Sequence, residues 1–452
     1  MTNRSAATTT KEIYAFIAPD EALPVNDPRY VPLEEARGDT NVAALLAARI
    51  EAQQSAFATG ASNEHARFLL TGHRGCGKST ELYRLKALLE GAGFAVVRFD
   101  AETELNLQTL EWWNVLLEMV WQLDEQLAQP PYNIQMPDSL RDDVAQWLAR
   151  VVTTKTQRTE MEASLTADFE VGAAVSFFAK AKAAIRSLVK AGSSRAEEIK
   201  TEVERRPDAL RDAVAKFVKE AQGKLRAQGN HGLVIIADGL EKIPSRPMGE
   251  NLTSHNLLFL HNGNHLKAPP CHLVYTVPLT LLSSANLTTV FAESPVLMPM
   301  IHLRHRNGEQ DARALRMMTK LVALRASPAL FAPGVIKELA VASGGHIRDF
   351  LLLVREAATG FGERVTKRDA SRAVRGLINF YDRLIEQKFV SVLDTVEANA
   401  ILPRGEHDGE LLNRLLVLEY HNDDIWHALH PCVKQAPSFV RSPRAPQTDA
   451  TP

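Results

Sequence analysis

One short glycine-rich segment constrains this chain more than any other feature. Residues 72–79 read Gly-His-Arg-Gly-Cys-Gly-Lys-Ser and match the pattern G-x-x-x-x-G-K-[ST] in full. The segment follows an apolar run, Phe68–Leu70, and precedes a stretch from Leu82 to Leu89 whose leucines fall on one helix face. Strand, glycine turn and helix in this order form the context in which the pattern binds phosphate. The sequence therefore predicts a phosphate-binding P-loop.

The P-loop residues have distinct chemical roles. Glycines let backbone N–H groups curl round a phosphate, and the following helix adds the partial positive charge of its N-terminus. Lys78 is expected to bridge the β- and γ-phosphates, and the Ser79 hydroxyl to ligate Mg²⁺. The residues expected to bind ATP are Gly72, His73, Arg74, Gly75, Cys76, Gly77, Lys78, Ser79 and Thr80.

Further strands predict the fold class. Phe94–Phe99 reads as a second strand, which makes a βαβ unit with the first, and the continuous apolar run Leu233–Ala237 is typical of a strand covered on both faces of a parallel sheet. Leu273–Val277 and Val296–Leu303 are expected to add a fourth and a fifth strand. We therefore expect an α/β P-loop NTPase with a parallel sheet, a large, mostly helical insertion, a C-terminal helical lid and a winged-helix-like domain.

The domain boundaries follow from composition and spacing. We expect disordered tails at 1–10 and 435–452, a P-loop core at 11–305 with an insertion at about 101–232, a helical lid at 306–362 and a winged-helix-like domain at 363–434. Within the insertion, alternation from Leu165 to Phe177 suggests a strand or hairpin. At the C-terminal end, the apolar runs Leu411–Tyr420 and Ile425–His430 predict a β-hairpin.

Overall charge limits the partners. Lys and Arg number 52 against 54 Asp and Glu, so no global positive field attracts nucleic acid or anionic lipid. The three cysteines are too few for a disulfide framework and fit a reducing compartment. We find neither a signal peptide nor a membrane-spanning run, and we expect a cytoplasmic protein without a membrane partner.

Two acids are candidates for the catalytic centre. Asp238 directly follows the strand Leu233–Ala237, where a Walker B aspartate would help to hold Mg²⁺. Glu241 lies three residues further on and could deprotonate the attacking water, or it could be an exposed loop glutamate. Thr366–Asp369 superficially matches the guanine-reading pattern T-K-x-D, but here it begins a helix, which favours a capping role for Thr366 and adenine as the base.

Taken together, these motifs resemble a family. The P-loop, the block Asp238–Glu241, a strand ending at Thr276 and the segment Ser343–Asp349 occur in the order seen in AAA+ and related STAND ATPases. The chain is most similar to the initiator-like clade and to bacterial ATPases with a Gly-His-Arg-Gly-x-Gly-Lys-Ser-Thr-Glu-Leu P-loop, some of which belong to conflict or phage-defence systems. The resemblance implies that Thr276 is a sensor-1 residue and Arg348 a sensor-2 arginine. It leaves Arg304 and Arg306 as candidates for an arginine finger.

Two further groups of residues bear on metal binding and on DNA binding, and neither pattern favours such binding. His255, His261, His265, Cys271 and His272 lie close in sequence, but their spacings match no usual zinc site. From Phe361 to Pro452 there are 12 Lys and Arg against 13 Asp and Glu, and Asp423 and Asp424 lie at the expected hairpin tip. Carboxylates at that tip disfavour a grip on DNA phosphates.

The sequence supports three functional hypotheses. The first is an ATP-binding and ATP-hydrolysing switch that controls a partner protein or an assembly, as a homo-oligomer or with an effector, and resemblance suggests antiphage defence. Gly239 stands where commoner AAA+ proteins have a second acid after Asp238, so turnover is expected to be slow. The alternatives are a DNA-associated ATPase of the initiator or transposition-regulator type, and a nucleotide-binding scaffold without turnover.

Overall fold

The chain folds into two compact units, which we describe separately. The computed structural model describes residues 6–144, 200–201, 203–249, 252–284, 286–405, 407–422 and 424–441. The P-loop unit comprises Met1–Val42, Thr71–Arg84 and Leu297–Pro452, and the sheet unit comprises Ala43–Leu70 and Leu85–Val296. This grouping differs from the expected division at residue 305, because it joins the P-loop to the C-terminal elements. The alternating segment Leu165–Phe177 lies outside the described residues.

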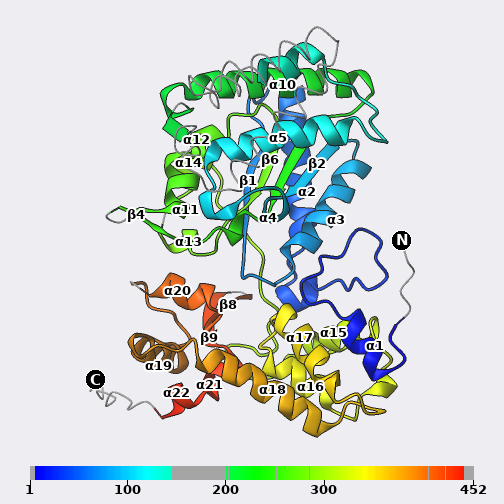
Figure 1. The fold of residues 1–452 in the computed structure, drawn as a ribbon, viewed down its shortest axis with the longest axis vertical. Helices are drawn as coiled ribbons and strands as arrows, with labels where there is room; N and C mark the ends of the chain where they lie inside the picture. The colour runs from blue at the N-terminus through cyan, green and yellow to red at the C-terminus, as the bar shows by residue number, and fades with distance from the viewer. Residues whose placement is uncertain are drawn as a thin grey trace, which may run out of the picture. The chain divides into compact units, whose positions relative to one another are not determined.

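A five-stranded sheet in the order β2-β3-β6-β1-β7 forms the core of the fold (Figure 1). The strands are β1 (Arg67–Thr71), β2 (Ala95–Asp100), β3 (Leu233–Asp238), β6 (His272–Thr276) and β7 (Val296–Leu297). The pairs β1–β6, β3–β6 and β2–β3 are parallel. The α/β class and the five strands expected from the apolar runs are confirmed, although β7 is much shorter than Val296–Leu303.

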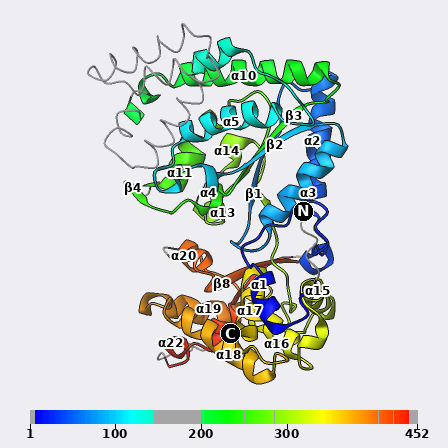
Figure 2. The ribbon, with the colours of Figure 1, turned by 45° about the vertical axis from the view of Figure 1, so that its right-hand side comes forward.

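Both faces of the sheet are covered. Alternate residues of β2 and β3, such as Val97 and Ile235, belong to one core cluster, while their neighbours Val96 and Ile236 are also fully buried. Helix α5 (Trp112–Leu127) packs on β2, and α10 (Pro207–Ala227) packs on α5. Figure 2 shows α2 (Val42–Ala58) and α3 (Lys78–Gly91) on the other side of the strands. Burial on both faces explains why these strands are continuously apolar.

The other elements that the structure describes in the sheet unit are short. They are α4 (Ala101–Glu104), η2 (Leu107–Thr109), η3 (Leu240–Lys242), β4 (Pro247–Gly249), β5 (Leu252–Thr253), α11 (Ser254–Asn256), η4 (Leu257–His261), α12 (Gly263–Leu266), α13 (Leu281–Ser284) and α14 (Thr288–Phe291). Trp112, Trp113 and Trp121 are buried in the core cluster, as their helical spacing predicts.

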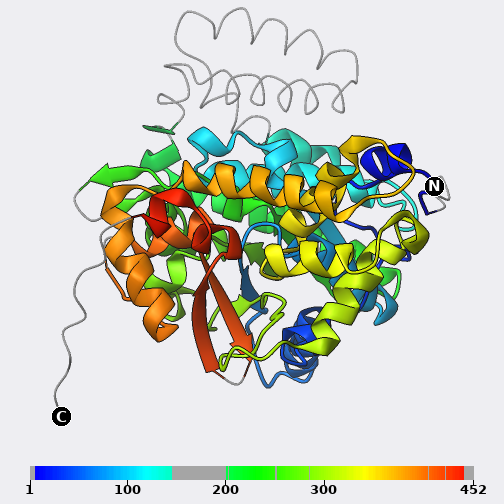
Figure 3. The same cartoon turned by 90° about the horizontal axis from the view of Figure 1, so that it is seen from below.

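Helices and one hairpin make up most of what the structure describes of the P-loop unit (Figure 3). The elements are α1 (Thr10–Phe16), η1 (Glu34–Arg37), α15 (Ala312–Ala323), η5 (Pro328–Leu330), α16 (Val335–Ala342), α17 (Ile347–Ala357), η6 (Ala358–Gly360), α18 (Lys367–Asp382), η7 (Gln387–Phe389), α19 (Val390–Asn399), α20 (Asp408–Asn413), β8 (Val417–Asn422), β9 (Asp424–Leu429), α21 (Pro431–Lys434) and α22 (Pro437–Val440). Strands β8 and β9 pair antiparallel, which confirms the expected hairpin. The first part of the expected strand Leu411–Tyr420 is the end of helix α20 instead.

Both ends of the chain are ordered further than expected. Ala7 is fully buried and pairs with Ala326, and Thr9 caps α1 through a capping box with Glu12. At the other end, α22 buries Phe439. The pairing of Ala7 with Ala326 joins residues far apart in sequence, which composition does not reveal. Residues 6–10 and 435–441 are therefore ordered, although composition led us to expect tails there.

Candidate functional site

The P-loop has the backbone that its glycines predict. It joins the end of β1 to the start of α3, and Gly72, Gly75 and Gly77 have φ angles of 146°, 79° and 103°. A Cβ atom on Gly72 would lie 2.8 Å from the carbonyl oxygen of Met298. Only glycine combines these angles with so close an approach. The predicted strand–loop–helix context is confirmed.

The Lys78 side chain contacts the backbone of the P-loop. Its side chain is buried, and its Nζ donates hydrogen bonds to the carbonyl oxygens of Gly72 at 2.9 Å and His73 at 3.0 Å. An ammonium group carries three donors, so the same group can exchange these carbonyls for phosphate oxygens. Ser79 follows in the first turn of α3, whereas the Thr80 hydroxyl accepts a hydrogen bond from the Leu23 N–H at 3.1 Å. Thr80 therefore contacts the N-terminal segment.

His73 connects the P-loop to the C-terminal hairpin. The side chain is buried, and its Nε2 accepts a hydrogen bond from the backbone N–H of Glu419 in β8 at 2.9 Å. Burial lowers the pKa of His73 to about 3, so the ring is neutral and able to accept. Glu419 itself lies against His421 and His427. Although burial opposes ionisation, these histidines lower the pKa of Glu419 to about 2.

The N-terminus of α17 contacts the P-loop at a second point. The Nε2 of His346 lies 2.5 Å from the carbonyl oxygen of Arg74, as in a hydrogen bond donated by the ring. A Cβ atom on Gly75 would lie 2.7 Å from the Cβ of Arg348. The guanidinium of Arg348 pairs with Asp20 at 2.7 Å. The sensor-2 candidate thus lies beside the loop within the same unit, with its charge engaged by an N-terminal carboxylate.

A buried carboxylate supports that helix end. Asp349 accepts a hydrogen bond from the Tyr381 hydroxyl at 2.6 Å and lies 3.1 Å from His346 and 3.2 Å from His430. Burial alone would raise the pKa of Asp349, but the two histidines lower it well below its ordinary value. The carboxylate is therefore ionised and orients His346 toward the P-loop.

Sequence reasoning missed one cation at the P-loop. Arg37, at the end of η1, is buried and donates a hydrogen bond from Nη2 to the carbonyl oxygen of Cys76. Its Nη1 lies 3.9 Å from Glu81 of α3. A Cβ atom on Gly77 would lie 3.3 Å from Nη2. No spacing rule connects an arginine to a P-loop that begins 35 residues later. The sequence therefore did not predict that Arg37 contacts the P-loop.

Asp238 belongs to the sheet unit and is fully buried at the end of β3. Its Oδ2 accepts a hydrogen bond from Arg98 Nη2 at 2.5 Å, and its Oδ1 accepts one from the Gly239 N–H at 2.8 Å. Gly239 has a φ of 82°, and a Cβ atom there would lie 2.5 Å from Asp100 Oδ1. The left-handed φ and this close approach together explain why glycine follows Asp238.

Glu241 and Thr276 lie near Asp238 in the same unit. Glu241 is in the single turn η3 and is 6% exposed, so its interpretation as an exposed loop residue is wrong. Thr276 is buried at the end of β6, and its hydroxyl accepts a hydrogen bond from the Leu240 N–H at 3.0 Å. That bond fixes the turn that carries Glu241.

Asp238 and Thr276 lie at the carboxyl ends of two neighbouring parallel strands, β3 and β6. Leu70 in β1 pairs with Thr276 in β6, and Ala237 in β3 pairs with Tyr275. Asp238 and Thr276 therefore lie at the same end of the sheet, at the carboxyl ends of its parallel strands. Ligands of open α/β sheets bind outside this end.

The other sequence candidates have structural partners. The Nδ1 of His272 accepts from the Ala66 N–H at 3.0 Å, His255 Nε2 lies 2.8 Å from the Ile243 carbonyl oxygen, and His265 stacks on Trp112. Burial raises the pKa of Cys271 to about 12. No group of three potential metal ligands is found among the described residues. Thr366 caps α18 through a capping box with Asp369, which confirms the capping role.

Comparisons with known proteins identify no family. No family model and no curated protein matches the chain. Among solved structures, the Aeropyrum pernix ORC2 protein, in ADPNP and ADP complexes, aligns with a TM-score of 0.41 and 14% identity over 90% of this chain and 93% of its own. Cdc6p from Pyrobaculum aerophilum aligns with a TM-score of 0.39 and 10% identity over 94% of this chain and 96% of its own.

In the part of the chain that the structure describes, no helix is long and apolar enough to cross a membrane.

Proposed function

We propose that this protein is an ATP-dependent switch that binds and hydrolyses ATP to control a partner protein or an assembly. The observation that carries the proposal is the attachment of the P-loop to C-terminal elements of its own unit. His73 accepts a hydrogen bond from β8, and the Arg74 carbonyl oxygen accepts one from His346 at α17. A phosphate that rearranges this loop changes both contacts, so nucleotide state is transmitted to the lid helices and the hairpin.

The donor set fits a triphosphate with Mg²⁺. A glycine-rich turn, the Lys78 ammonium and the Ser79 hydroxyl at a helix start are the groups that such a ligand requires. We propose that Ser79 and Asp238 hold Mg²⁺ and that Glu241 deprotonates the attacking water. Bound Mg²⁺ would supply positive charge to the phosphate oxygens. Thr276 and Arg348 would respond to loss of the γ-phosphate.

The first test is nucleotide binding. Lys78→Ala removes the ammonium, and we expect ATP affinity to fall by about tenfold to a hundredfold, the worth of one or two charge-assisted hydrogen bonds. Lys86→Ala is the matched control, because Lys86 lies on the same helix but pairs with Glu90 at 3.7 Å. Titration of both variants with ATP and GTP also reveals the base preference. Equal ATP affinity in the two variants would remove the P-loop from the proposal.

The second test separates a hydrolysing switch from a scaffold. Glu241→Gln keeps the shape of the side chain but removes its basicity, so we expect unchanged ATP binding and hydrolysis slowed by roughly a hundredfold or more. The measurement is phosphate release in single turnover. If wild type releases no phosphate, the scaffold hypothesis replaces the switch.

Partner class requires separate experiments. Light scattering with and without ATP and Mg²⁺ measures a change of assembly state, which we expect for the switch. A DNA-associated ATPase would instead show DNA affinity that falls steeply with salt. The described part of the hairpin tip disfavours DNA, because Asp424 is exposed there.

Antiphage defence is our proposal for the cellular setting. It rests on the P-loop sequence from Gly72 to Leu82, which resembles that of bacterial defence ATPases. Expression of wild type and Lys78→Ala together with the neighbouring genes in phage-challenged bacteria tests it. Protection by wild type alone is expected, and equal plaque numbers in both strains would contradict the proposal.

A further inference from the structure

A hollow lies on one side of the C-terminal hairpin, within the P-loop unit. Its volume is about 460 Å³, within the range of small-molecule pockets. Apolar groups form much of its wall: Tyr420 and Trp426 stack with ring centroids 4.4 Å apart, and Val396 and Leu429 lie near them. The proposed ATP site does not use these residues. The hollow is therefore a separate candidate site.

The segment 303–308 adds positive charge to this hollow. Arg304 and Arg306 line it and are exposed, and neither guanidinium forms an ion pair with a residue that the structure describes. The carboxylate in the lining, Glu397, is neutralised by Lys434 at 2.7 Å. The pocket thus combines an aromatic wall with two exposed arginines that form no ion pair with a described residue.

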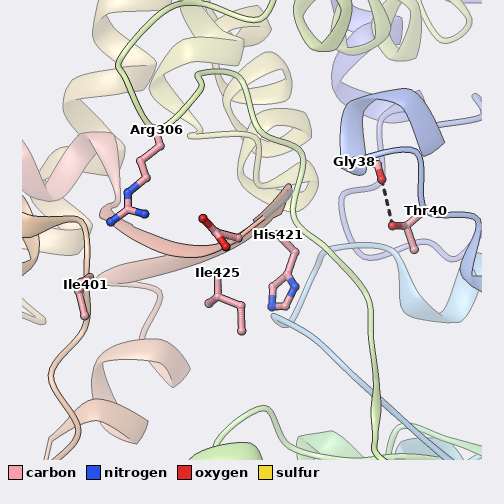
Figure 4. A pocket seen from close by; sticks show the side chains of 7 residues that line it. Gly38, Thr40, Arg306, Ile401, His421 and Ile425 are labelled. Atoms are coloured by element: carbon pink, nitrogen blue, oxygen red, sulfur yellow. Dashed lines mark hydrogen bonds between the residues drawn. The ribbon is translucent and has the colours of Figure 1, made fainter.

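Arg306 also lines a second, more open hollow of about 710 Å³ (Figure 4). In this view its side chain points away from the segment that carries it and toward the hairpin. Ile401 and Ile425, which are 52% and 55% exposed, line the same hollow as Arg306. Arg306 therefore stands between two hollows, where its guanidinium is accessible to a ligand entering the smaller one.

We propose that the smaller hollow binds a small organic anion with a planar apolar body. Tyr420 and Trp426 would contact the apolar body, and the two guanidinium groups would bind a carboxylate, sulfonate or phosphate head. Guanidinium binds such heads through paired hydrogen bonds. Charge complementarity selects an anion over a neutral or cationic ligand of equal size.

The same pocket is connected to the P-loop by hydrogen bonds. The Tyr420 hydroxyl donates to the Gly344 carbonyl oxygen at 2.6 Å, two residues before His346, which contacts Arg74. The residue before Tyr420, Glu419, donates its N–H to His73. A ligand packed on Tyr420 therefore stabilises the hairpin position that the P-loop also contacts. This coupling, unlike the pocket itself, rests on the proposed nucleotide site.

The binding test uses anilinonaphthalene sulfonate, a fluorescent probe with a planar apolar body and one anionic head. We expect one saturable site in the folded protein. The double substitution Arg304→Ala, Arg306→Ala should weaken its affinity by about tenfold, the worth of one charge-assisted hydrogen bond. Arg316→Ala, an exposed arginine of α15 outside the lining, is the matched control.

A filling substitution tests the location of the site. Ala428→Phe places a ring inside the lining of the hollow and should abolish probe binding while thermal unfolding stays cooperative. Probe affinity that is unchanged by both the double arginine variant and Ala428→Phe would overturn the proposal. A lost signal in the Arg316→Ala control would do the same.

Coupling is tested with Tyr420→Phe, which keeps the aromatic ring and removes only the bond to Gly344. In wild type, ATP should change probe affinity severalfold, and the probe should change ATP affinity by the same factor, because linkage is reciprocal. In Tyr420→Phe, both ligands should bind and the factor should fall toward one. Probe binding without ATP binding would contradict the proposed function alone. Both ligands binding with no mutual effect in wild type would contradict the coupling alone.

Discussion

At the residue scale, Gly75 shows how tightly the P-loop is enclosed by its own unit. Its φ is 79°, and an added Cβ would lie 2.7 Å from both the Arg348 Cβ and the His346 Nε2. Gly75→Ala should therefore displace the start of α17 and lower ATP affinity by about tenfold or more. Isothermal titration and thermal unfolding measure the two effects.

Gly60 offers the matched control for that substitution. Its φ is 73°, but no heavy atom lies within 4 Å of an added Cβ. Gly60→Ala should show only the backbone strain, about 1 kcal/mol, with ATP affinity unchanged. Equal losses in the two variants would mean that backbone strain, rather than the contact with α17, accounts for the effect at Gly75.

Arg98 and Asp238 form the other informative residue pair. Asp238 is fully buried and the Arg98 side chain is 9% exposed, so Arg98→Met would remove the guanidinium from a carboxylate with no exposed surface. We expect a loss of about 3–5 kcal/mol in the free energy of unfolding, typical of breaking a buried ion pair. The double variant Arg98→Met, Asp238→Asn should recover part of that loss. Chemical denaturation checks both, and additive losses would contradict a direct interaction.

At the element scale, the start of α18 distinguishes a helix cap from a guanine reader. Thr366 accepts a hydrogen bond from the Asp369 N–H at 3.3 Å, and Asp369 accepts one from the Thr366 N–H at 3.0 Å. Thr366→Ala should cost about 1 kcal/mol of stability and leave the ratio of ATP to GTP affinity unchanged. Thr319→Ala, a hydroxyl within α15, should cost less. A changed nucleotide ratio would restore the guanine interpretation.

The elements also show which signals a sequence carries. Apolar runs predicted β1, β2, β3 and β6 within one or two residues, because burial on both faces requires continuous apolar character. The hairpin was predicted, but the start of its first strand was not. Leu411 and Leu412 are apolar in α20 as they would be in a strand, and so short an apolar run does not distinguish a helix from a strand.

At the scale of the whole molecule, buried neutral histidines make stability depend on pH. Burial lowers the pKa of His73 and His272 from 6.5 to about 3. The unfolded chain therefore binds protons below about pH 6.5 that the folded chain excludes, and stability falls as pH decreases through that range. Each histidine should contribute roughly 1.4 kcal/mol per pH unit between about pH 6 and 4.

Denaturant unfolding at several pH values checks this expectation. Above about pH 7.5, His73 and His272 should cause no change in the free energy of unfolding. Below about pH 6.5, they should make it decrease. His73→Gln should reduce the slope of the free energy of unfolding against pH by roughly 1.4 kcal/mol per pH unit, the contribution of one histidine. A free energy of unfolding that stays constant between about pH 6.5 and 5 would contradict the burial of these rings in neutral form.

The sequence by itself determined the features that depend on neighbouring residues. The P-loop, its flanking strand and helix, the Thr366 cap and the apolar strands all follow from patterns a few residues long. Backbone angles, the apolar face of a helix and the burial of a strand on both faces each leave such a local pattern. Only the tertiary structure decided the contacts of His73 with Glu419, of Arg98 with Asp238 and of Arg37 with Cys76. These pairs join residues 39 to 346 positions apart, and no periodicity encodes a hydrogen bond across such a distance. The same reason hid the pocket beside the hairpin, whose arginines and aromatic wall come from separate segments.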